Sequence, residues 1–196
     1  ATVVNEGNLR AANGGYIVLA GSKVSNTGTI SAVGGSAALA AGAQVALDLP
    51  GDGKIDLVVN QAAVQAAVTN SGHIVADGGQ VILAGRTGDS VLTHVINNSG
   101  VIEAKSVNQA NGVIRLEGGS NGVVMNSGTL DASGKGIGQV GGKVTVTGDK
   151  IALMSGSMID ASGDLGGGTV LVGGNFHGQG PEKNASMVYV APQSTI

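Results

Sequence analysis

Cysteine is absent from this chain, and aromatic and charged residues are rare. Of the 196 residues, 2% are aromatic and 12% are charged, and this charged share is about half of the usual one. Without cysteine the chain has neither disulfides nor thiolate metal ligands. The low charge and the 42% of hydrophobic residues also exclude an intrinsically disordered chain, which combines high charge with few apolar residues.

Two further absences limit the partners of the chain. Lys and Arg are scattered and the formal net charge is −3, so no basic stripe is present to bind the phosphates of a nucleic acid. No run of about 18 apolar residues occurs, and we therefore predict no membrane span. The sequence starts inside a repeated phrase, which leads us to expect a fragment of a longer protein.

Glycine, by contrast, is abundant, with 36 residues. These glycines do not occupy every third position, which excludes a collagen helix. The apolar residues between them are mainly small or β-branched. This combination is typical of many short strands joined by tight turns.

Two short phrases recur along the whole chain. The first is Asn-x-Gly-x-(Ile/Leu)-x-Ala, and the second is Gly-Gly followed by alternating apolar residues, as in GGYIVLAG and GGQVILAG. The asparagine of the first phrase occurs at Asn5, Asn26, Asn70, Asn98 and Asn126, and a degenerate copy surrounds Ile159. One repeat unit therefore spans roughly 21 to 29 residues, a length typical of a solenoid.

Each unit contains two or three strands with period-2 alternation and no helical pattern. A solenoid built only from strands is a parallel β-helix, in which each coil stacks on the next at the strand spacing of about 4.8 Å. Irregular coils of this length favour the right-handed form over the left-handed form, whose repeats are short and regular. We predict an all-β, right-handed parallel β-helix of about 6–8 coils that forms a single domain over residues 1–196.

The first phrase predicts two columns of side chains that run along the stack. Its apolar residue points inward and stacks on its equivalents, which gives the column Ile30, Ile74, Ile102, Leu130 and Ile159. Its asparagine marks a corner, where a left-handed φ and side-chain bonds to the backbone suit the bend, and the glycine two residues later tolerates the turn. We expect a structural ladder in which each asparagine amide bonds the next, with the members Asn26, Asn70, Asn98 and Asn126.

Two segments depart from the repeat. Asn70 follows Asn26 by 44 positions, an interval that corresponds either to two short coils or to one coil with an insertion. The extra segment has two alternating strands around LPGDGK, a strong turn signal, and we interpret residues 44–59 as a β-hairpin that projects from the coil stack. Residues 174–186, which contain Phe176 and His177, are predicted to form a protruding loop.

Three successive units carry an acid directly after the inward Ile or Leu, namely Glu103, Asp131 and Asp160. Period-2 alternation turns these three side chains outward, with their backbones roughly 5 Å apart. One interpretation is a solvated acidic stripe that Lys105 and Lys135 relieve. The other is that the stripe binds a cation such as calcium weakly. Under both interpretations, as long as no cation is bound, repulsion between like charges raises the pKa values of these carboxyl groups in the folded state.

Three motif matches are attributed to turns. Residues 136–141, GIGQVG, fit a dinucleotide-binding pattern, but a strand follows where a helix is required. Ser120 in GGSNG fits a nucleophile elbow, again without the following helix. The calcium-loop-like stretch around LPGDGK has Pro50 at a ligand position. The three histidines share no ligand spacing, so beyond the stripe we predict no metal site, and we predict no catalytic residue and no cofactor.

The paired phrases VSNTGTISAVGGSAALAAG and VTNSGHIVADGGQVILAG, and the order of the segments, resemble the filamentous-haemagglutinin family of large exoproteins. The resemblance covers essentially the whole chain. It implies a long right-handed β-helix, export by two-partner secretion with an outer-membrane transporter as partner, and a location outside the cell or on the bacterial surface. The secretion domain of that family carries an Asn-Pro-Asn-Gly motif that this sequence lacks, so we expect the stretch just after that domain, or the early shaft.

We therefore expect a structural shaft or interaction segment of a secreted bacterial adhesin, which attaches to an unidentified host-cell receptor, glycan or matrix component and is not an enzyme. Two alternatives stay open. Polysaccharide lyases and hydrolases share the β-helix, but they need acids clustered with a basic residue or paired carboxylates, and Arg is rare here. Other members of the family capture haem from host proteins, which should act through loops that leave the coil.

Overall fold

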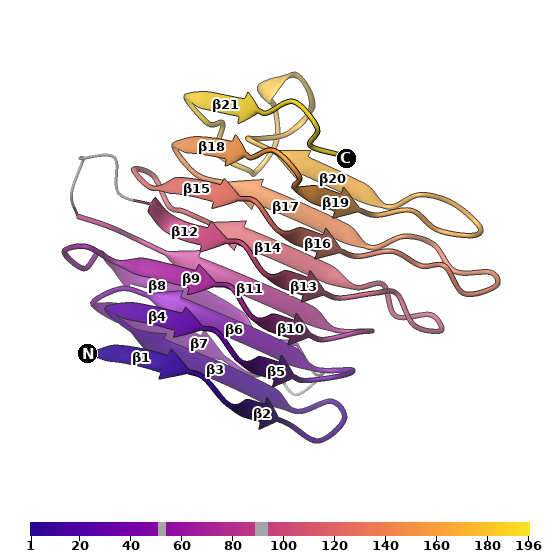
Figure 1. Ribbon diagram of the computed structural model, residues 1–196, viewed down its shortest axis with the longest axis horizontal. Coiled ribbons are helices and arrows are strands. Elements are labelled where there is room, and N and C mark those ends of the chain that lie inside the picture. Colours follow the sequence, from indigo (N-terminus) through magenta and orange to yellow (C-terminus); the bar gives the residue numbers. More distant parts are fainter. Residues whose placement is uncertain (51–53, 89–93) are drawn as a thin grey trace.

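The computed structural model describes residues 1–50, 54–88 and 94–196. Strands form nearly all of the regular structure in this part of the chain, where the single helical element is a short 3-10 turn, η1 (Phe176–Gly178). The strands stack in coils from β1 (Thr2–Asn5) at one end to β21 (Met187–Val190) at the other (Figure 1). The prediction of an all-β parallel β-helix is confirmed.

Three parallel sheets run along the stack, and each coil contributes one strand to each of them, except the last coil, which contributes only β21 to the first sheet. The first sheet contains β1, β4 (Lys23–Asn26), β9 (Ala67–Asn70), β12 (His94–Asn98), β15 (Val123–Asn126), β18 (Lys150–Leu153) and β21. The second contains β2 (Asn8–Arg10), β5 (Thr29–Ser31), β10 (His73–Val75), β13 (Val101–Glu103), β16 (Thr129–Asp131) and β19 (Met158–Asp160). The third contains β3 (Tyr16–Gly21), β6 (Ser36–Ala41), β11 (Gln80–Gly85), β14 (Val113–Glu117), β17 (Lys143–Thr147) and β20 (Thr169–Val172).

The core is a set of columns built from equivalent residues of successive coils. In the second sheet one column pairs in register and is 2% exposed at most; its members are Ile30, Ile74, Ile102, Leu130 and Ile159. Half-buried Leu9 continues this column into the first coil, because β2 pairs with β5. Alternation leaves the neighbours of each inward residue outside the core, as expected for strands of period 2.

The glycine of the first phrase has a different role from the predicted one. The backbone at Gly72 does not have a positive φ, so the turn itself does not demand glycine there. A Cβ atom built on Gly72 would instead collide with the backbone carbonyl of Gly28 in the preceding coil. Stacked turns therefore come too close together for any side chain, and this close approach selects glycine.

The inserted segment is an antiparallel hairpin, β7 (Gln44–Asp48) and β8 (Asp56–Gln61), placed between β6 and β9. The long interval is thus one coil with an insertion. The hairpin does not stand away from the stack as the sequence interpretation proposed. It packs on the outer face of the third sheet, where Ile55 and Leu57 are buried against Ile82.

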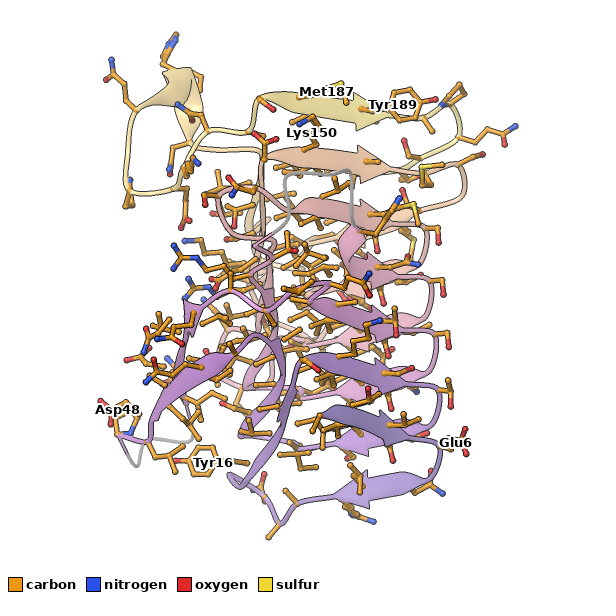
Figure 2. All side chains as sticks on the ribbon, turned by 90° about the vertical axis from the view of Figure 1, so that its left-hand side faces the viewer. Glu6, Tyr16, Asp48, Lys150, Met187 and Tyr189 are labelled. Carbon is orange, nitrogen blue, oxygen red and sulfur yellow. The ribbon has the colours of Figure 1, made fainter. Side chains whose placement is uncertain are left out.

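This packing follows from the composition of β6 and β11, which are apolar on both faces and are buried along their whole length. An apolar outer face needs a cover, and burial of its area stabilises the covering segment. The hairpin supplies that cover. Its end at Asp48 lies on the same side of the stack as the loop that follows β20, at the left of Figure 2. In residues 1–50, 54–88 and 94–196 we find no helix with the length and apolarity that a membrane crossing requires.

Candidate functional site

The asparagines of the repeated phrase form a continuous ladder inside one corner of the helix. Each side-chain amide donates to the Oδ1 of the asparagine one coil further on, at distances from 2.7 to 2.8 Å. The ladder joins Asn5, Asn26, Asn70, Asn98 and Asn126, all of which are buried. It ends because Leu153 occupies the equivalent position opposite Asn126 in β18. Its role is structural, since buried amides need partners.

The backbone of the ladder differs from the expectation. Asn26, Asn70 and their equivalents are the last residues of first-sheet strands, and their φ values are not positive. The predicted left-handed conformation is therefore wrong. The parallel ladder of the sheet holds each residue extended, and the amide bonds the carbonyl of the glycine two residues later as well as the next asparagine. Asn5 also belongs to the ladder, although the predicted set began at Asn26.

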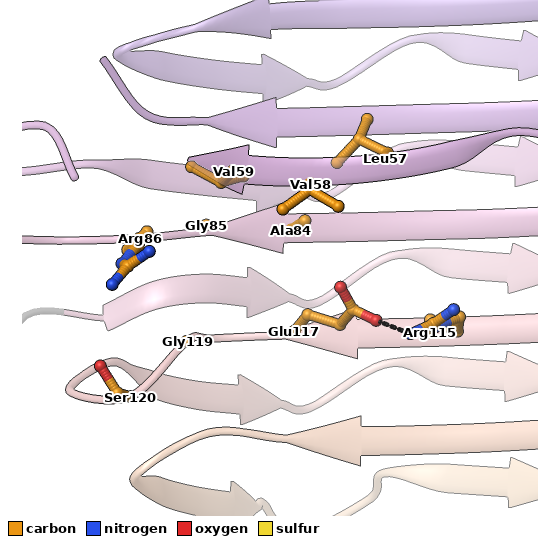
Figure 3. A pocket seen from close by; sticks show the side chains of 10 residues that line it. All are labelled: Leu57, Val58, Val59, Ala84, Gly85, Arg86, Arg115, Glu117, Gly119 and Ser120. Atoms are coloured by element: carbon orange, nitrogen blue, oxygen red, sulfur yellow. Dashed lines mark ion pairs between the residues drawn. The ribbon is translucent and has the colours of Figure 1, made fainter. Parts of the chain in front are cut away.

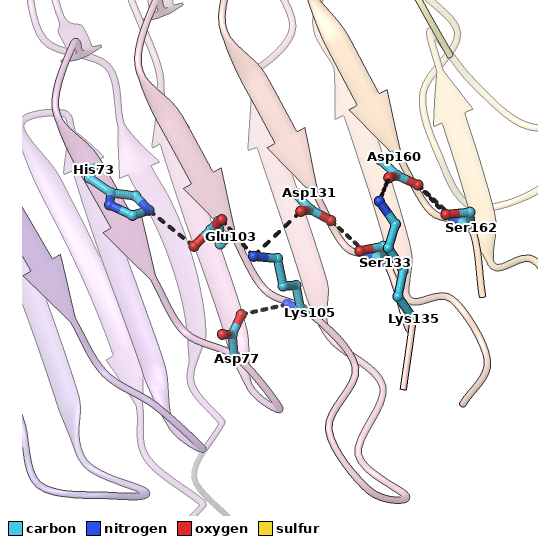
Figure 4. Close-up of polar contacts among 9 residues, drawn as sticks. All are labelled: His73, Asp77, Glu103, Lys105, Asp131, Ser133, Lys135, Asp160 and Ser162. Carbon is cyan, nitrogen blue, oxygen red and sulfur yellow. Dashed lines mark hydrogen bonds and ion pairs between the residues drawn. The ribbon is translucent and has the colours of Figure 1, made fainter. Parts of the chain in front are cut away.

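The three predicted acids lie in register on the outer face of the second sheet (Figure 4). Lysines separate their charges. Lys105 Nζ lies 2.6 Å from Glu103 and 3.6 Å from Asp131, and Lys135 Nζ lies 2.8 Å from Asp160. The column is thus an alternation of carboxylates and ammonium groups. Within the described ranges no three potential metal-ligating side chains are grouped.

The lysines reverse the predicted direction of the pKa shifts. Burial alone would raise the pKa of Glu103, but hydrogen bonds from Lys105 and His73 lower it below its ordinary value. Burial likewise opposes the shift at Asp160, where hydrogen bonds from Lys135 and Ser162 lower the pKa to about 2. The expectation of raised pKa values is therefore wrong for both groups, because close opposite charges outweigh repulsion between carboxylates one coil apart.

A groove crosses the outer face of the third sheet between the hairpin and the loop before β21. Its hairpin end has a volume of about 330 Å³, and a second hollow of about 280 Å³ lies toward the loop. The two hollows adjoin, because Glu117, Gly119 and Ser120 line both of them. Figure 3 shows the hairpin end, with β8 above and the outward side chains of β14 opposite.

Two side chains at the ends of β11 fasten the hairpin wall of this groove. Gln80 Nε2 donates a buried 2.7 Å hydrogen bond to the backbone carbonyl of Ile55, just before β8. Arg86 Nη1 donates a 3.3 Å hydrogen bond to the carbonyl of Asn60, near the end of β8. The start of β11 thus contacts the residue before β8, and the residue after β11 contacts the end of β8, so the two strands run in the same direction.

The groove contains charges of both signs. The Arg115 guanidinium forms an ion pair with Glu117 on the same outward face of β14. From the loop, Lys183 Nζ donates a 3.3 Å hydrogen bond to the carbonyl of Ser120, and Glu182 lines the same hollow. Burial raises the pKa of Glu117 above its ordinary value; Arg115 opposes this shift and Glu182 adds to it. A surface with charges of both signs can bind a polar partner.

Sequence reasoning did not single out Arg86, Arg115, Glu117 or Lys183. A signal for two of them is visible in the strand patterns. The strands SAALAA and QVILAG are apolar on both faces, whereas VIRLE carries Arg115 and Glu117 at alternate positions. The change from strands that are apolar on both faces to a strand with one charged face indicates where the covered part of the sheet ends.

Comparison with solved structures returns a likeness that extends over the whole chain. The chain superposes on the crystal structure of the HMW1 secretion domain from Haemophilus influenzae with a TM-score of 0.82 and 31% sequence identity. The likeness covers 100% of this chain and 50% of that chain, so this chain spans about half of the similar structure. No family model matches the sequence. No curated protein matches it either.

Proposed function

We propose that this chain is a recognition segment for export, belonging to a secreted adhesin-type protein that an outer-membrane transporter of the two-partner route carries. The observation that carries this proposal is the likeness over the full chain to a secretion domain, at 31% identity and a TM-score of 0.82. An identity of this size supports more than a shared fold. The likeness favours the secretion region itself over the stretch after it, where the missing Asn-Pro-Asn-Gly motif had placed the chain.

The architecture suits a chain that is exported unfolded and folds outside. Each coil pairs with its neighbours through parallel ladders, so the stack can grow coil by coil. The core needs no disulfide, since the chain has no cysteine. Burial of the inward columns and of the asparagine ladder supplies the stability instead.

The outer elements give this β-helix a surface that plain coils lack. The hairpin, the groove and the loop before β21 all lie on one side, whereas the opposite corner repeats the same asparagine turn in successive coils. Recognition by a transporter needs a surface that differs from the repeat, and this side supplies one. We also propose that the parent protein attaches to a host receptor, glycan or matrix component at the cell surface. In this proposal the chain binds a partner and does not catalyse a reaction.

An export assay tests the proposal. The chain, carrying a periplasmic targeting signal and an epitope tag, is produced in bacteria with and without the transporter encoded beside the parent gene. We expect the tagged chain in the medium only when the transporter is present. A transporter with a disabled periplasmic domain is the matched control. Equal release with and without the transporter, or retention of a folded and soluble chain in the periplasm in both strains, would contradict the proposal.

A further inference from the structure

We infer that a hollow beside the charged column of the second sheet binds a neutral saccharide through the hydroxyl groups of its sugar ring. The hollow has a volume of about 460 Å³, within the range of about 300–1,000 Å³ that small-molecule sites occupy. Sugar binding is measured on the isolated chain, so this inference neither rests on the proposed role in export nor falls with it.

Loops of unequal length form the hollow. Residues 76–79 join β10 to β11, whereas the longer segments 104–112 and 132–142 join β13 to β14 and β16 to β17. The two longer loops reach beyond the shorter one (Figure 1), and all three contribute to the lining. Two backbone hydrogen bonds between Val107 and Ala110 close the first of the longer loops, which gives the hollow a fixed wall.

A buried hydroxyl group without a partner points to a ligand. Ser133 lines the hollow and is 2% exposed, yet its Oγ has no hydrogen-bond partner among the described residues. Ser162 is the equivalent residue one coil further on, and there the hydroxyl donates a 2.6 Å bond to Asp160. A polar group that protein covers and leaves without a bond costs free energy. The Ser133 hydroxyl is thus available to a ligand in the hollow.

Two carboxylates in the lining add open acceptors. Asp77 Oδ1 accepts a 2.8 Å bond from the backbone N–H of Lys105, and Asp131 Oδ1 accepts a 2.9 Å bond from that of Ser133. The second oxygen of Asp77 has no partner in the part of the chain that the structure describes. The second oxygen of Asp131 lies 3.6 Å from Lys105 Nζ, which is beyond the length of a hydrogen bond. Both oxygens can accept from hydroxyl groups of a ligand.

Two ammonium groups supply donors to the same hollow. Lys105 Nζ contacts Glu103 at 2.6 Å, and Lys135 Nζ contacts Asp160 at 2.8 Å. Each contact uses one of three N–H groups, so each lysine keeps further donors. Figure 4 shows the two lysine side chains on either side of Asp131. The hollow therefore offers donors, acceptors and a hydroxyl group together.

The charges of the hollow favour a neutral ligand. Its lining carries two lysines and two aspartates, so their charges balance. Each ammonium group already lies against a carboxylate, and a strongly charged ligand would have to separate these ion pairs. A hydroxyl group both donates and accepts, so adjacent hydroxyls of a sugar ring can bond the open groups while the pairs persist. The described lining has no aromatic ring for a base to stack on, which leaves hydrogen bonds as the means of recognition.

A titration with simple sugars tests this inference on the intact 196-residue chain. The probes are the methyl glycosides of glucose, galactose and mannose, and backbone amide signals of the isotope-labelled chain are the readout. Each is added up to about 100 mM, because a ligand held by a few hydrogen bonds binds weakly. We expect saturable shifts at Lys105, Ser106, Ser133 and Gln139 with at least one glycoside. Cyclohexanol, a ring with a single hydroxyl, should bind at least about tenfold more weakly.

Variants of the chain assign the hydroxyl group. Ser133→Ala should weaken the bound glycoside about two- to tenfold, because one hydrogen bond is lost. Ser162→Ala is the matched control and should leave the affinity unchanged, since that hydroxyl is bonded to Asp160 and Ser162 does not line the hollow. Asp131→Asn keeps the test valid if Ser133→Ala fails to fold. It replaces an open acceptor oxygen by a donor and should weaken the glycoside by a similar factor.

Three outcomes would overturn the inference. The first is the absence of saturable shifts with all three glycosides, or equal binding of cyclohexanol. The second is tighter binding of sodium sulfate than of any glycoside, which would show a site for anions; we expect no saturable shift with sulfate. The third is an unchanged affinity in both Ser133→Ala and Asp131→Asn, which would place the sugar outside this hollow.

Discussion

The side-chain amide of Asn70 donates a 2.7 Å hydrogen bond to Oδ1 of Asn98, a residue 28 positions further along the chain. Asn70 also accepts a 2.8 Å bond from Asn26, so it is both donor and acceptor within the buried corner. The bond exists because each coil repeats the same phrase and the coils pair in register. A polar side chain is thereby made part of a core that is otherwise apolar.

Replacement of Asn70 by alanine should destabilise the chain by about 2–5 kcal/mol. The change removes the partners of the buried Asn26 amide and of the buried Asn98 side-chain oxygen. Each buried polar group left without a partner costs about 1–3 kcal/mol. Urea denaturation measures the effect. Asn8→Ala is the matched control, because Asn8 is exposed on β2 and should change the free energy of unfolding by less than about 0.5 kcal/mol. Equal losses in the two variants would show that the ladder does not stabilise the corner.

Gly72→Ala should cost about 1–3 kcal/mol, since the new methyl group meets the Gly28 carbonyl and forces two coils apart. The control is Gly7→Ala in the first coil, where an added Cβ has no atom within 4 Å. That variant should leave stability unchanged, or raise it by up to about 1 kcal/mol because alanine lowers the conformational entropy of the unfolded chain. Thermal unfolding followed by circular dichroism compares the two. A loss as large in Gly7→Ala would mean that local conformation, and not coil contact, selects glycine.

The hairpin should behave as a second small core. Ile55 is 2% exposed beneath it, and Ile55→Ala should lower the free energy of unfolding by about 2–5 kcal/mol. Leu49 lies on the same hairpin but is 49% exposed, so Leu49→Ala should change stability by less than about 0.5 kcal/mol. Guanidinium denaturation of both variants measures the difference. Similar small effects for the two would indicate a hairpin that does not pack on the sheet.

The ion pair of Asp160 with Lys135 should make stability depend on pH in acid. The folded pKa of Asp160 is about 2, below the ordinary value of 3.8. Its contribution is therefore present above the ordinary pKa and is lost as the pH falls through the folded value. Between about pH 5 and pH 2.5, wild type should lose more free energy of unfolding than Asp160→Asn, by less than about 1 kcal/mol because the lysine is exposed.

An NMR titration provides the control for this linkage. In Lys135→Met the pKa of Asp160 should rise toward 3.8, since the ammonium partner is gone. An unchanged value in this variant would assign the low pKa to Ser162 alone.

Calcium should leave the melting temperature of the wild-type chain unchanged when millimolar calcium is compared with a chelator. Lys105 and Lys135 already lie between the three carboxylates, and a divalent cation would have to displace them. The double variant Lys105→Met with Lys135→Met keeps the acids and removes the lysines, so calcium should stabilise it. A calcium-dependent rise in the wild type would instead support the cation interpretation of the stripe.

The repeated phrase allowed much of the fold to be predicted. Its length indicated a solenoid, and its alternation identified Ile30, Ile74, Ile102 and their equivalents as neighbours, because like phrases on successive coils pair in register. The error on Asn70 has a local origin. Turn statistics favour a left-handed asparagine, but here the ladder of the first sheet holds the residue extended. Local preference yields when neighbouring strands fix the backbone.

The sequence by itself thus determined the quantities that depend on near neighbours: strand period, repeat length, and which residue of each phrase enters the core. The tertiary structure decided everything that depends on where distant segments come to lie. It placed the hairpin on β6 and β11, opened the groove over β14, and set Lys183 beside Ser120. The physical reason is that burial and electrostatic interaction act between atoms in space, over distances that a one-dimensional pattern does not contain.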